Sequence, residues 1–281
     1  MVYFKSISAE SQLKKLRVNN YLMSYIDLGS GSPTILVHGS INDFRTWAAI
    51  LGPLSAERRV VAPSLRHYFP EMWDGKHGRF SIDQHVDDMV AFIEGLDLGA
   101  VDLIGHSRGG LICYRIATKR PDLVNKLVLA EPAGVLEQSL IPADAPYRGA
   151  REFIVASSEK IAAGDVEGGL KVFIDGVNGE GAWEKLPPEL RQMREDNAFT
   201  LLGHINDQPQ PYTQSEAASI SVPTLFVIGG ETPGMLPVIS EVLSAHVPGA
   251  VKVVIPGAGH SMFRQQPKAF CNSVLQFLES H

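Results

Sequence analysis

A serine stands between glycines in the segment Gly105-His106-Ser107-Arg108-Gly109. The apolar run Val101 to Ile104 before it predicts a buried strand, and the apolar pattern after it predicts a helix. On a sharp strand-to-helix turn a serine projects its hydroxyl, and flanking glycines let strand and helix approach closely. We therefore predict that Ser107 is a nucleophile; the alternative is an ordinary serine in a tight turn.

A serine hydroxyl attacks a carbonyl well only when a base accepts its proton, so a histidine is expected later in the chain. His260 ends the turn Gly257-Ala258-Gly259-His260, directly after the apolar run Val251 to Ile255. Because the carboxyl ends of parallel strands meet at one edge of a sheet, His260 and Ser107 are expected to emerge together. We predict that His260 is the base.

Acyl transfer also needs two backbone amides that bind the oxyanion of the tetrahedral intermediate. One is expected at Arg108, the residue after the nucleophile. The other is expected in the loop after the strand-like run Thr34 to His38, at Ser40, with Ile41 as the fallback. We interpret His38 itself as holding this loop.

The Arg108 side chain has two interpretations. It meets an anionic substrate, or it lies in solvent or in an ion pair, as most arginines do. The second is the more common state of this residue type.

Six short runs rich in β-branched and apolar residues predict strands. They are Thr34 to His38, Val60 to Val61, Val101 to Ile104, Lys126 to Ala130, Thr224 to Ile228 and Val251 to Ile255. Most lack alternation of apolar and polar residues, which is typical of strands covered on both faces of a mainly parallel sheet.

Amphipathic helices are expected between these runs. The clearest extends from Ser81 to about Leu96, where Ser81 and Gln84 are expected to form a capping box. Another begins at Pro267 and ends the chain. Strands alternating with helices predict an α/β protein.

The alternation stops between Pro132 and Ile220, where helix-like pieces rich in Pro, Gly and Ala replace strands. We expect residues 133–219 to form an inserted helical cap, and residues 1–132 and 220–281 to form the core domain. The cap is expected to set specificity, because the insertion interrupts the chain at the edge where Ser107 and His260 emerge.

With these motifs the chain resembles the α/β-hydrolase superfamily, in the branch with an HGx loop, a GxSxG elbow, a helical cap and a terminal GxGH turn. The resemblance extends over nearly the whole chain. It implies an eight-stranded, mostly parallel sheet with helices on both faces and a cap over the active site. Serine at position 107 disfavours the epoxide hydrolases and haloalkane dehalogenases of this fold, which carry aspartate there.

The chain departs from the superfamily at the residue that orients the histidine. The family usually has a Gly-x-x-Asp turn after the strand that matches Thr224 to Ile228, but this chain has Pro233 in the aspartate position. Proline has no group that can orient an imidazole. We predict that Glu131 supplies the carboxylate, because it directly follows the predicted strand next to that of Ser107. Glu231 is the alternative acid.

A second departure follows the run Val60 to Val61. The family usually has Asp-x-x-Gly-x-Gly here, whereas the chain reads Pro-Ser-Leu-Arg-His-Tyr-Phe-Pro over residues 63–70. Arg66, His67 and Tyr68 are therefore candidates for the substrate pocket; the alternative is that they hold the loop together.

The composition excludes several classes of function. A formal net charge of −6 gives no basic surface for nucleic acid. A mean hydropathy of +0.02 and the lack of a long apolar run predict a soluble protein that does not bind a membrane. Two cysteines far apart in the chain, without a disulfide pattern, favour the cytoplasm. Neither of the two cysteines has metal-ligand spacing, and no nucleotide or metal motif occurs, so neither cofactor nor metal is expected.

We therefore expect a serine hydrolase that cleaves a carboxylic ester or lactone of a small molecule through an acyl-enzyme. Hydrolysis of a carbon-carbon bond in a ring-cleavage product and cofactor-free perhydrolase chemistry are alternatives on the same scaffold. A receptor-like protein that only binds its ligand is the alternative outside enzymes, and the complete set of nucleophile, base and oxyanion loop argues against it. The sequence specifies neither the substrate nor the oligomeric state.

Overall fold

The fold is built on one eight-stranded sheet with the order β1-β2-β4-β3-β5-β6-β7-β8. The computed structural model describes residues 13–145 and 150–280. The strands are β1 (Lys14–Val18), β2 (Tyr21–Leu28), β3 (Pro33–Val37), β4 (Arg59–Pro63), β5 (Val101–His106), β6 (Val124–Ala130), β7 (Thr224–Gly229) and β8 (Val251–Ile255). β2 pairs antiparallel with β1 and β4, and all other pairs are parallel. This confirms the predicted fold class and adds the β1–β2 hairpin, which the sequence patterns did not identify.

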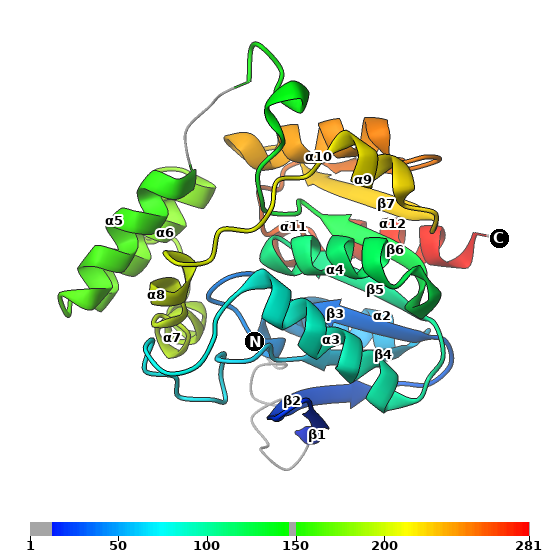
Figure 1. Cartoon of the computed structure of the whole chain (residues 1–281), viewed down its shortest axis with the longest axis horizontal. Coiled ribbons are helices and arrows are strands. Elements are labelled where there is room, and N and C mark those ends of the chain that lie inside the picture. The colour runs from blue at the N-terminus through cyan, green and yellow to red at the C-terminus, as the bar shows by residue number, and fades with distance from the viewer. Residues whose placement is uncertain (1–12, 146–149, 281) are drawn as a thin grey trace.

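Helices cover both faces of the sheet (Figure 1). The flanking helices are α2 (Ala48–Ser55), α3 (Ile82–Leu96), α4 (Arg108–Lys119), α9 (Gln214–Ser219), α10 (Met235–His246), α11 (Met262–Gln265) and α12 (Pro267–Glu279). One buried cluster joins the sheet to α3, α4 and α10, and a second joins it to α2, α11 and α12. Among the described residues, no helix has both the length and the apolar run that crossing a bilayer requires.

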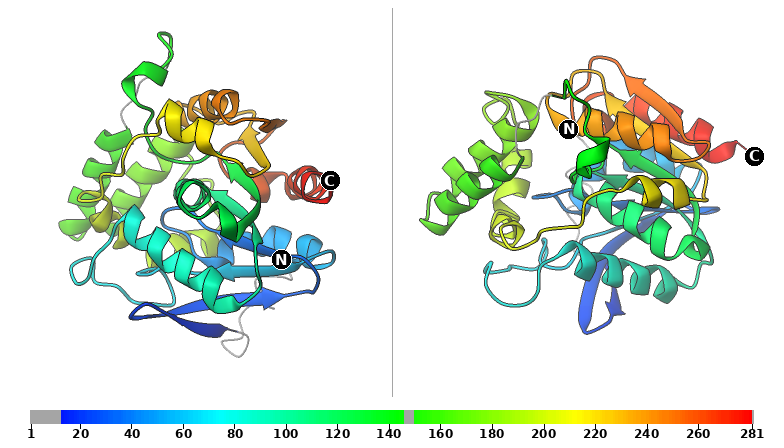
Figure 2. Two further views of the ribbon diagram at one scale, coloured as in Figure 1. Left: turned by 45° about the vertical axis from the view of Figure 1, so that its right-hand side comes forward. Right: turned by 45° about the horizontal axis from the view of Figure 1, so that its top comes forward.

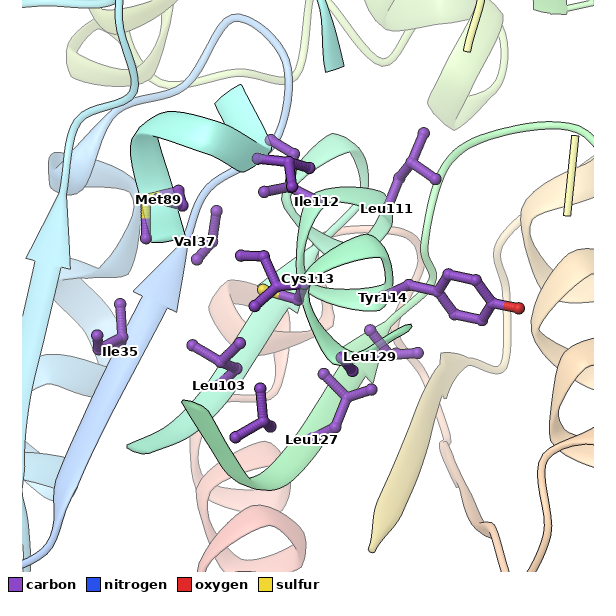
Figure 3. Close-up of a cluster of buried hydrophobic side chains, with 14 of the residues drawn as sticks. Ile35, Val37, Met89, Leu103, Leu111, Ile112, Cys113, Tyr114, Leu127 and Leu129 are labelled. Atoms are coloured by element: carbon purple, nitrogen blue, oxygen red, sulfur yellow. The ribbon is translucent and has the colours of Figure 1, made fainter. Parts of the chain in front are cut away.

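The helix α4 packs directly on the central strands. Figure 3 shows Val37 of β3, Leu103 of β5 and Leu129 of β6 gathered under it, with Cys113 pointing from α4 into the same cluster. All four side chains are inaccessible to solvent. The start of α4, which carries the nucleophile candidate, is therefore fixed by packing against three strands.

The six predicted strands lie within two residues of their expected bounds. Most of these strands are buried along their length, as expected, and β8 is the exception, where Val251 is 48% and Val254 is 46% exposed. β8 is the last strand of the sheet, so it lacks a neighbour on one side. Position in the strand order, which local sequence does not encode, explains the difference.

The two predicted helices are found, with one change in the capping of α3. Ser81 Oγ accepts the backbone N–H of Gln84 at 3.1 Å, as a capping box requires. The Gln84 side chain does not return this bond, because its Nε2 donates to Asp88 Oδ1 at 3.1 Å. The helix α12 begins at Pro267, as expected.

Four helices stand apart from the sheet: α5 (Ala150–Ala162), α6 (Val166–Asn178), α7 (Pro188–Asp196) and α8 (Thr200–His204) (Figures 1 and 2). Helices α5, α6 and α8 share a buried cluster of their own, which also contains Ile41 from the loop after β3. Arg194 of α7 donates to the Ile41 carbonyl at 3.0 Å, and Asn197 donates to Asp43 Oδ2 at 2.7 Å. The four helices thus lie over the carboxyl end of β3.

Described residues near both ends of the insertion pack with the sheet instead. Leu136 and Leu140, which precede α5, and Ala217 of α9 belong to the buried cluster that joins the sheet to α3 and α4. Among the described residues, α5–α8 therefore stand apart from the sheet, but the predicted insertion 133–219 as a whole does not. That this segment functions as a cap stays a prediction.

Glycine permits the close contact between α4 and β3. A Cβ atom on Gly109 would lie 2.0 Å from the Val37 carbonyl oxygen and 2.6 Å from that of His38. Backbone atoms of a central strand cannot move away without breaking ladder hydrogen bonds. No side chain fits at this position.

Replacing Gly109 by alanine is expected to lower the free energy of unfolding by about 3 kcal/mol or more, because the added methyl group overlaps backbone atoms. The measurement is urea-induced unfolding. Gly95→Ala is the matched control, since this helical glycine faces only the flexible end of Leu16, 3.1 Å from its Cβ position. The control is expected to stay within about 1 kcal/mol of the wild type. Equal stability of the two variants would contradict the close contact.

Candidate active site

Ser107 occupies a strained turn between β5 and α4. Its backbone has φ 54° and ψ −121°, a conformation that costs free energy for any residue with a Cβ atom. Its N–H donates to the Ala130 carbonyl at 3.1 Å, and its carbonyl accepts the Ala133 N–H at 2.9 Å. These bonds tie the turn to the end of β6. Among the described residues no group is hydrogen-bonded to Ser107 Oγ, and the residue borders a cavity.

His260 and Glu131 form a buried pair beside this turn. Glu131 Oε2 accepts a hydrogen bond from His260 Nδ1 at 2.6 Å, and Oε1 accepts the Gly229 N–H at 2.8 Å. The Glu131 side chain is fully buried and that of His260 is 6% exposed. Because a carboxylate only accepts, the proton of the neutral imidazole lies on Nδ1 and Nε2 is left as an acceptor.

The alternative acid lies elsewhere. Glu231 is exposed, and its backbone N–H donates to the Ala258 carbonyl at 2.9 Å. Among the described residues, the carboxylate hydrogen-bonded to His260 is that of Glu131. The structure thus brings together the first of the two glutamates and the histidine that the sequence singled out.

His106 contacts His260 and was not identified from the sequence. Its Nε2 donates to the His260 carbonyl at 2.8 Å, and the two ring centroids are 4.3 Å apart. Burial lowers the pKa of His106 well below its usual value. Its place in the sequence, between the apolar run Val101 to Ile104 and Ser107, could have identified it.

His38 links the loops that follow β3 and β4. Its Nε2 accepts the Leu65 N–H at 3.0 Å, and its Nδ1 donates to the Gly39 carbonyl at 2.9 Å. Gly39 lies so close to the elbow that a Cβ atom there would be 3.0 Å from Ser107 Cβ. The contacts of His38 agree with the interpretation that it holds this loop.

Two of the predicted oxyanion donors border the same cavity as Ser107. Ser40 and Arg108 both line it, and no described residue accepts a hydrogen bond from either backbone N–H. Ile41, the fallback, is 1% exposed, and the structure does not place it in the cavity wall. Ser40 is therefore the better placed of the two residues in this loop.

The cavity has a volume of about 860 Å³ and extends from the elbow toward the helices that stand apart from the sheet. Most of its wall is apolar. It includes Leu111 of α4, Phe153 and Ile154 of α5, Phe173 of α6, and Met235 and Leu236 of α10. Such a shape suits an organic molecule whose polar reacting group lies at one end.

The three pocket candidates after β4 are not in the wall of this cavity. Arg66 Nε is paired with Asp88 Oδ2 at 2.6 Å. The His67 ring stacks on Trp73 with centroids 4.3 Å apart, and the Tyr68 ring meets that of His38 edge-on at 4.8 Å. These contacts agree with the alternative, in which the three residues hold the loop together.

The two cysteine thiols are free and buried, and the described residues contain no cluster of metal-ligating side chains. Within residues 13–145 and 150–280, no three side chains of His, Cys, Asp or Glu gather closely enough to hold a metal ion. Burial raises the pKa of the Cys271 thiol to about 11 and also raises that of Cys113. Both thiols are therefore protonated at neutral pH.

Comparison with known proteins supplies a family. The model of the alpha/beta hydrolase family matches residues 34–273. Among curated proteins, a 2-hydroxy-6-oxo-2,4-heptadienoate hydrolase of Pseudomonas putida is 34% identical over 113 residues, which are 39% of this chain and only 40% of that protein.

Solved structures show the same fold over nearly the full length. An enol-lactonase of Burkholderia xenovorans superimposes with a TM-score of 0.78 at 20% identity, covering 95% of this chain and 100% of the other. A carboxylesterase of Bacillus subtilis has a TM-score of 0.77 at 20% identity, with 99% and 95% covered.

Several histidines around the site are uncharged because they are buried. Burial lowers the pKa of His38 to about 4 and lowers those of His85, His106 and His204 well below the usual value. In the unfolded chain each has a pKa of about 6.5. Between these values the unfolded chain binds protons that the folded chain does not.

The protein is therefore expected to lose stability as the pH falls from about 6.5 to 4, and His38 alone accounts for about 3 kcal/mol of the loss. Urea unfolding at pH 7.5 and pH 5 measures the effect. In His38→Gln the decrease over the same interval is expected to be smaller, because the titrating group is gone. An unchanged decrease in this variant, or none in the wild type, would contradict the prediction.

Proposed function

The chain belongs to the alpha/beta hydrolase family, and on that premise we propose that it is a serine hydrolase that cleaves a carboxylic ester or lactone of a small molecule. The observation that carries the proposal is the 2.6 Å hydrogen bond between His260 and the buried Glu131 beside the strained Ser107 turn. A carboxylate, an imidazole and a serine in this order form the arrangement that activates a hydroxyl for acyl transfer.

In the proposed reaction Ser107 Oγ attacks the substrate carbonyl while His260 Nε2 accepts its proton. The carbonyl oxygen becomes an oxyanion, and the amides of Ser40 and Arg108 donate to it. His260 then returns the proton to the leaving alcohol, which leaves an acyl group on Ser107. A water molecule attacks the acyl group by the same sequence and frees the acid.

Glu131 acts through His260. It holds the imidazole in the tautomer that leaves Nε2 free, and its negative charge stabilises the imidazolium that forms during attack. His106 and Gly229 assist, since one fixes the backbone of His260 and the other fixes the second oxygen of Glu131.

We also propose that α5–α8 form a cap that sets specificity, because Phe153, Ile154 and Phe173 from these helices line the cavity. A second candidate function is hydrolysis of a carbon-carbon bond in a ring-cleavage product. It is favoured by the match to the heptadienoate hydrolase, whose aligned segment is 34% identical. A panel of p-nitrophenyl esters, lactones and 1,5-diketones distinguishes the two by which bond is cleaved fastest.

Replacing Ser107 by alanine is expected to lower the turnover of the best ester by about 1,000-fold or more, since the attacking atom is lost. Stability is expected to stay equal or to rise. The measurement combines steady-state rates with labelling by a serine-directed fluorophosphonate, which should stop in the variant. Turnover close to that of the wild type would show that Ser107 is not the nucleophile.

The glutamates are tested by replacing each with glutamine, which keeps the shape and removes the charge. Glu131→Gln is expected to lower kcat by about 1,000-fold or more, because the imidazole loses the anion that orients and stabilises it. The exposed Glu231→Gln is the matched control, and its kcat is expected to change by less than about threefold. A large loss confined to Glu231→Gln would assign the acid to the other glutamate.

A further inference from the structure

We propose that Asp207 makes the cavity select uncharged substrates by neutralising Arg108, the cation that follows the nucleophile. This inference rests on the proposed function, hydrolysis at Ser107. It assigns a specificity role to a residue in the segment between α8 and α9 that the sequence did not single out.

The two side chains form an ion pair in the wall of the cavity. Arg108 Nη2 lies 2.6 Å from Asp207 Oδ2, and the side chains are only 6% and 4% exposed. The Arg108 guanidinium also lies over the Phe80 ring, 4.6 Å from its centroid. Both charged residues border the cavity that Ser107 borders. A substrate at Ser107 therefore meets the pair, and not a single cation.

The Asp207 carboxylate is fixed in place. Its second oxygen, Oδ1, accepts the N–H of Ile82 at 3.1 Å, at the first residue of α3. The amino end of a helix stabilises an anion. A carboxylate held by a guanidinium and a helix end does not turn away to leave Arg108 free for an incoming anion.

Asp207 neutralises the charge of Arg108, and the two histidines near Arg108 in the described part of the chain do not supply another positive charge. Arg108 also donates to His85 Nδ1 at 3.3 Å, but burial and the charge of Arg108 keep the pKa of His85 well below its usual value. His204, which lines the cavity, has a pKa lowered by the same two causes. Both imidazoles are therefore neutral.

The other charges along the described wall are mainly negative. Glu152, Asp175 and Glu180 line the cavity, and with Asp207 they make four carboxylates against two guanidiniums, those of Arg108 and Arg151. Arg151 donates through Nη2 to a backbone carbonyl at 2.8 Å. Arg151 is exposed, so water screens its charge. Next to Arg108 an anionic substrate would therefore lose its hydration and gain no unpaired buried cation, whereas an uncharged one loses little.

The first test compares the hydrolysis of three esters with the same six-carbon acyl chain by the wild-type protein. p-Nitrophenyl hexanoate is uncharged, mono-p-nitrophenyl adipate carries a carboxylate in place of the terminal methyl, and methyl p-nitrophenyl adipate restores a neutral end of similar polarity. After subtraction of spontaneous hydrolysis, kcat/KM is expected to be about tenfold or more lower for the anionic ester than for either neutral one.

The second test removes the neutralising charge. Asp207→Asn keeps the shape and leaves Arg108 unpaired, so the ratio of kcat/KM for the anionic ester to that for hexanoate is expected to rise about tenfold. The double variant Arg108→Met/Asp207→Asn removes both charges and is expected to return the ratio to near the wild-type value. If Asp207→Asn does not fold, the wild-type ratio still decides, because equal rates for the anionic and neutral esters would overturn the inference.

A wild-type protein that hydrolyses the anionic ester as fast as hexanoate would overturn the inference. So would a folded Asp207→Asn variant with an unchanged ratio. If none of the esters is hydrolysed and the fluorophosphonate does not label Ser107, the proposed function fails and the inference fails with it. By contrast, a protein that is labelled and active but prefers the anionic ester would leave the proposed function intact and overturn only the inference.

Discussion

The structure depends on one buried hydrogen bond, between Glu131 and His260. A carboxylate without exposure is costly unless both oxygens are satisfied, and here His260 Nδ1 and the Gly229 N–H satisfy them. The strand order β5-β6-β7 makes this possible, because Ser107, Glu131 and Gly229 lie at the ends of three neighbouring strands. The same order places β5 beside β3, so that α4, which follows β5, packs on β3 at Gly109. The order of the strands thus determines both how the sheet packs and where the residues of the site lie.

Structural features that a few adjacent residues determine could be predicted from the sequence. The run before Ser107, the glycines around it and Pro267 at the start of α12 each specify local backbone geometry, and the structure has those elements. Features that depend on distant neighbours could not. The exposure of β8 follows from its place at the edge of the sheet, and the incomplete capping box follows from Asp88, which attracts the Gln84 side chain.

The same distinction applies to the site. The pairing of Glu131 with His260 was predicted because Pro233 excludes the usual acid position and the order of strands leaves few carboxylates within reach. Glu131 and His260 are themselves 129 residues apart, but the resemblance to a family supplied the order of strands that brings them together. His106 and Asp207 were missed because neither the resemblance nor a local pattern indicates their partners. His106 meets His260 at a separation of 154 residues, and Asp207 meets Arg108 at a separation of 99. No local pattern marks such contacts.

The most direct measurement of the central claim is a crystal structure of the protein after reaction with a small fluorophosphonate. The account predicts phosphorus bonded to Ser107 Oγ, with the phosphonyl oxygen within hydrogen-bond distance of the Ser40 and Arg108 amides. It also predicts that His260 Nδ1 remains on Glu131. An adduct on another residue, a phosphonyl oxygen turned away from both amides, or His260 paired with Glu231 would contradict the account.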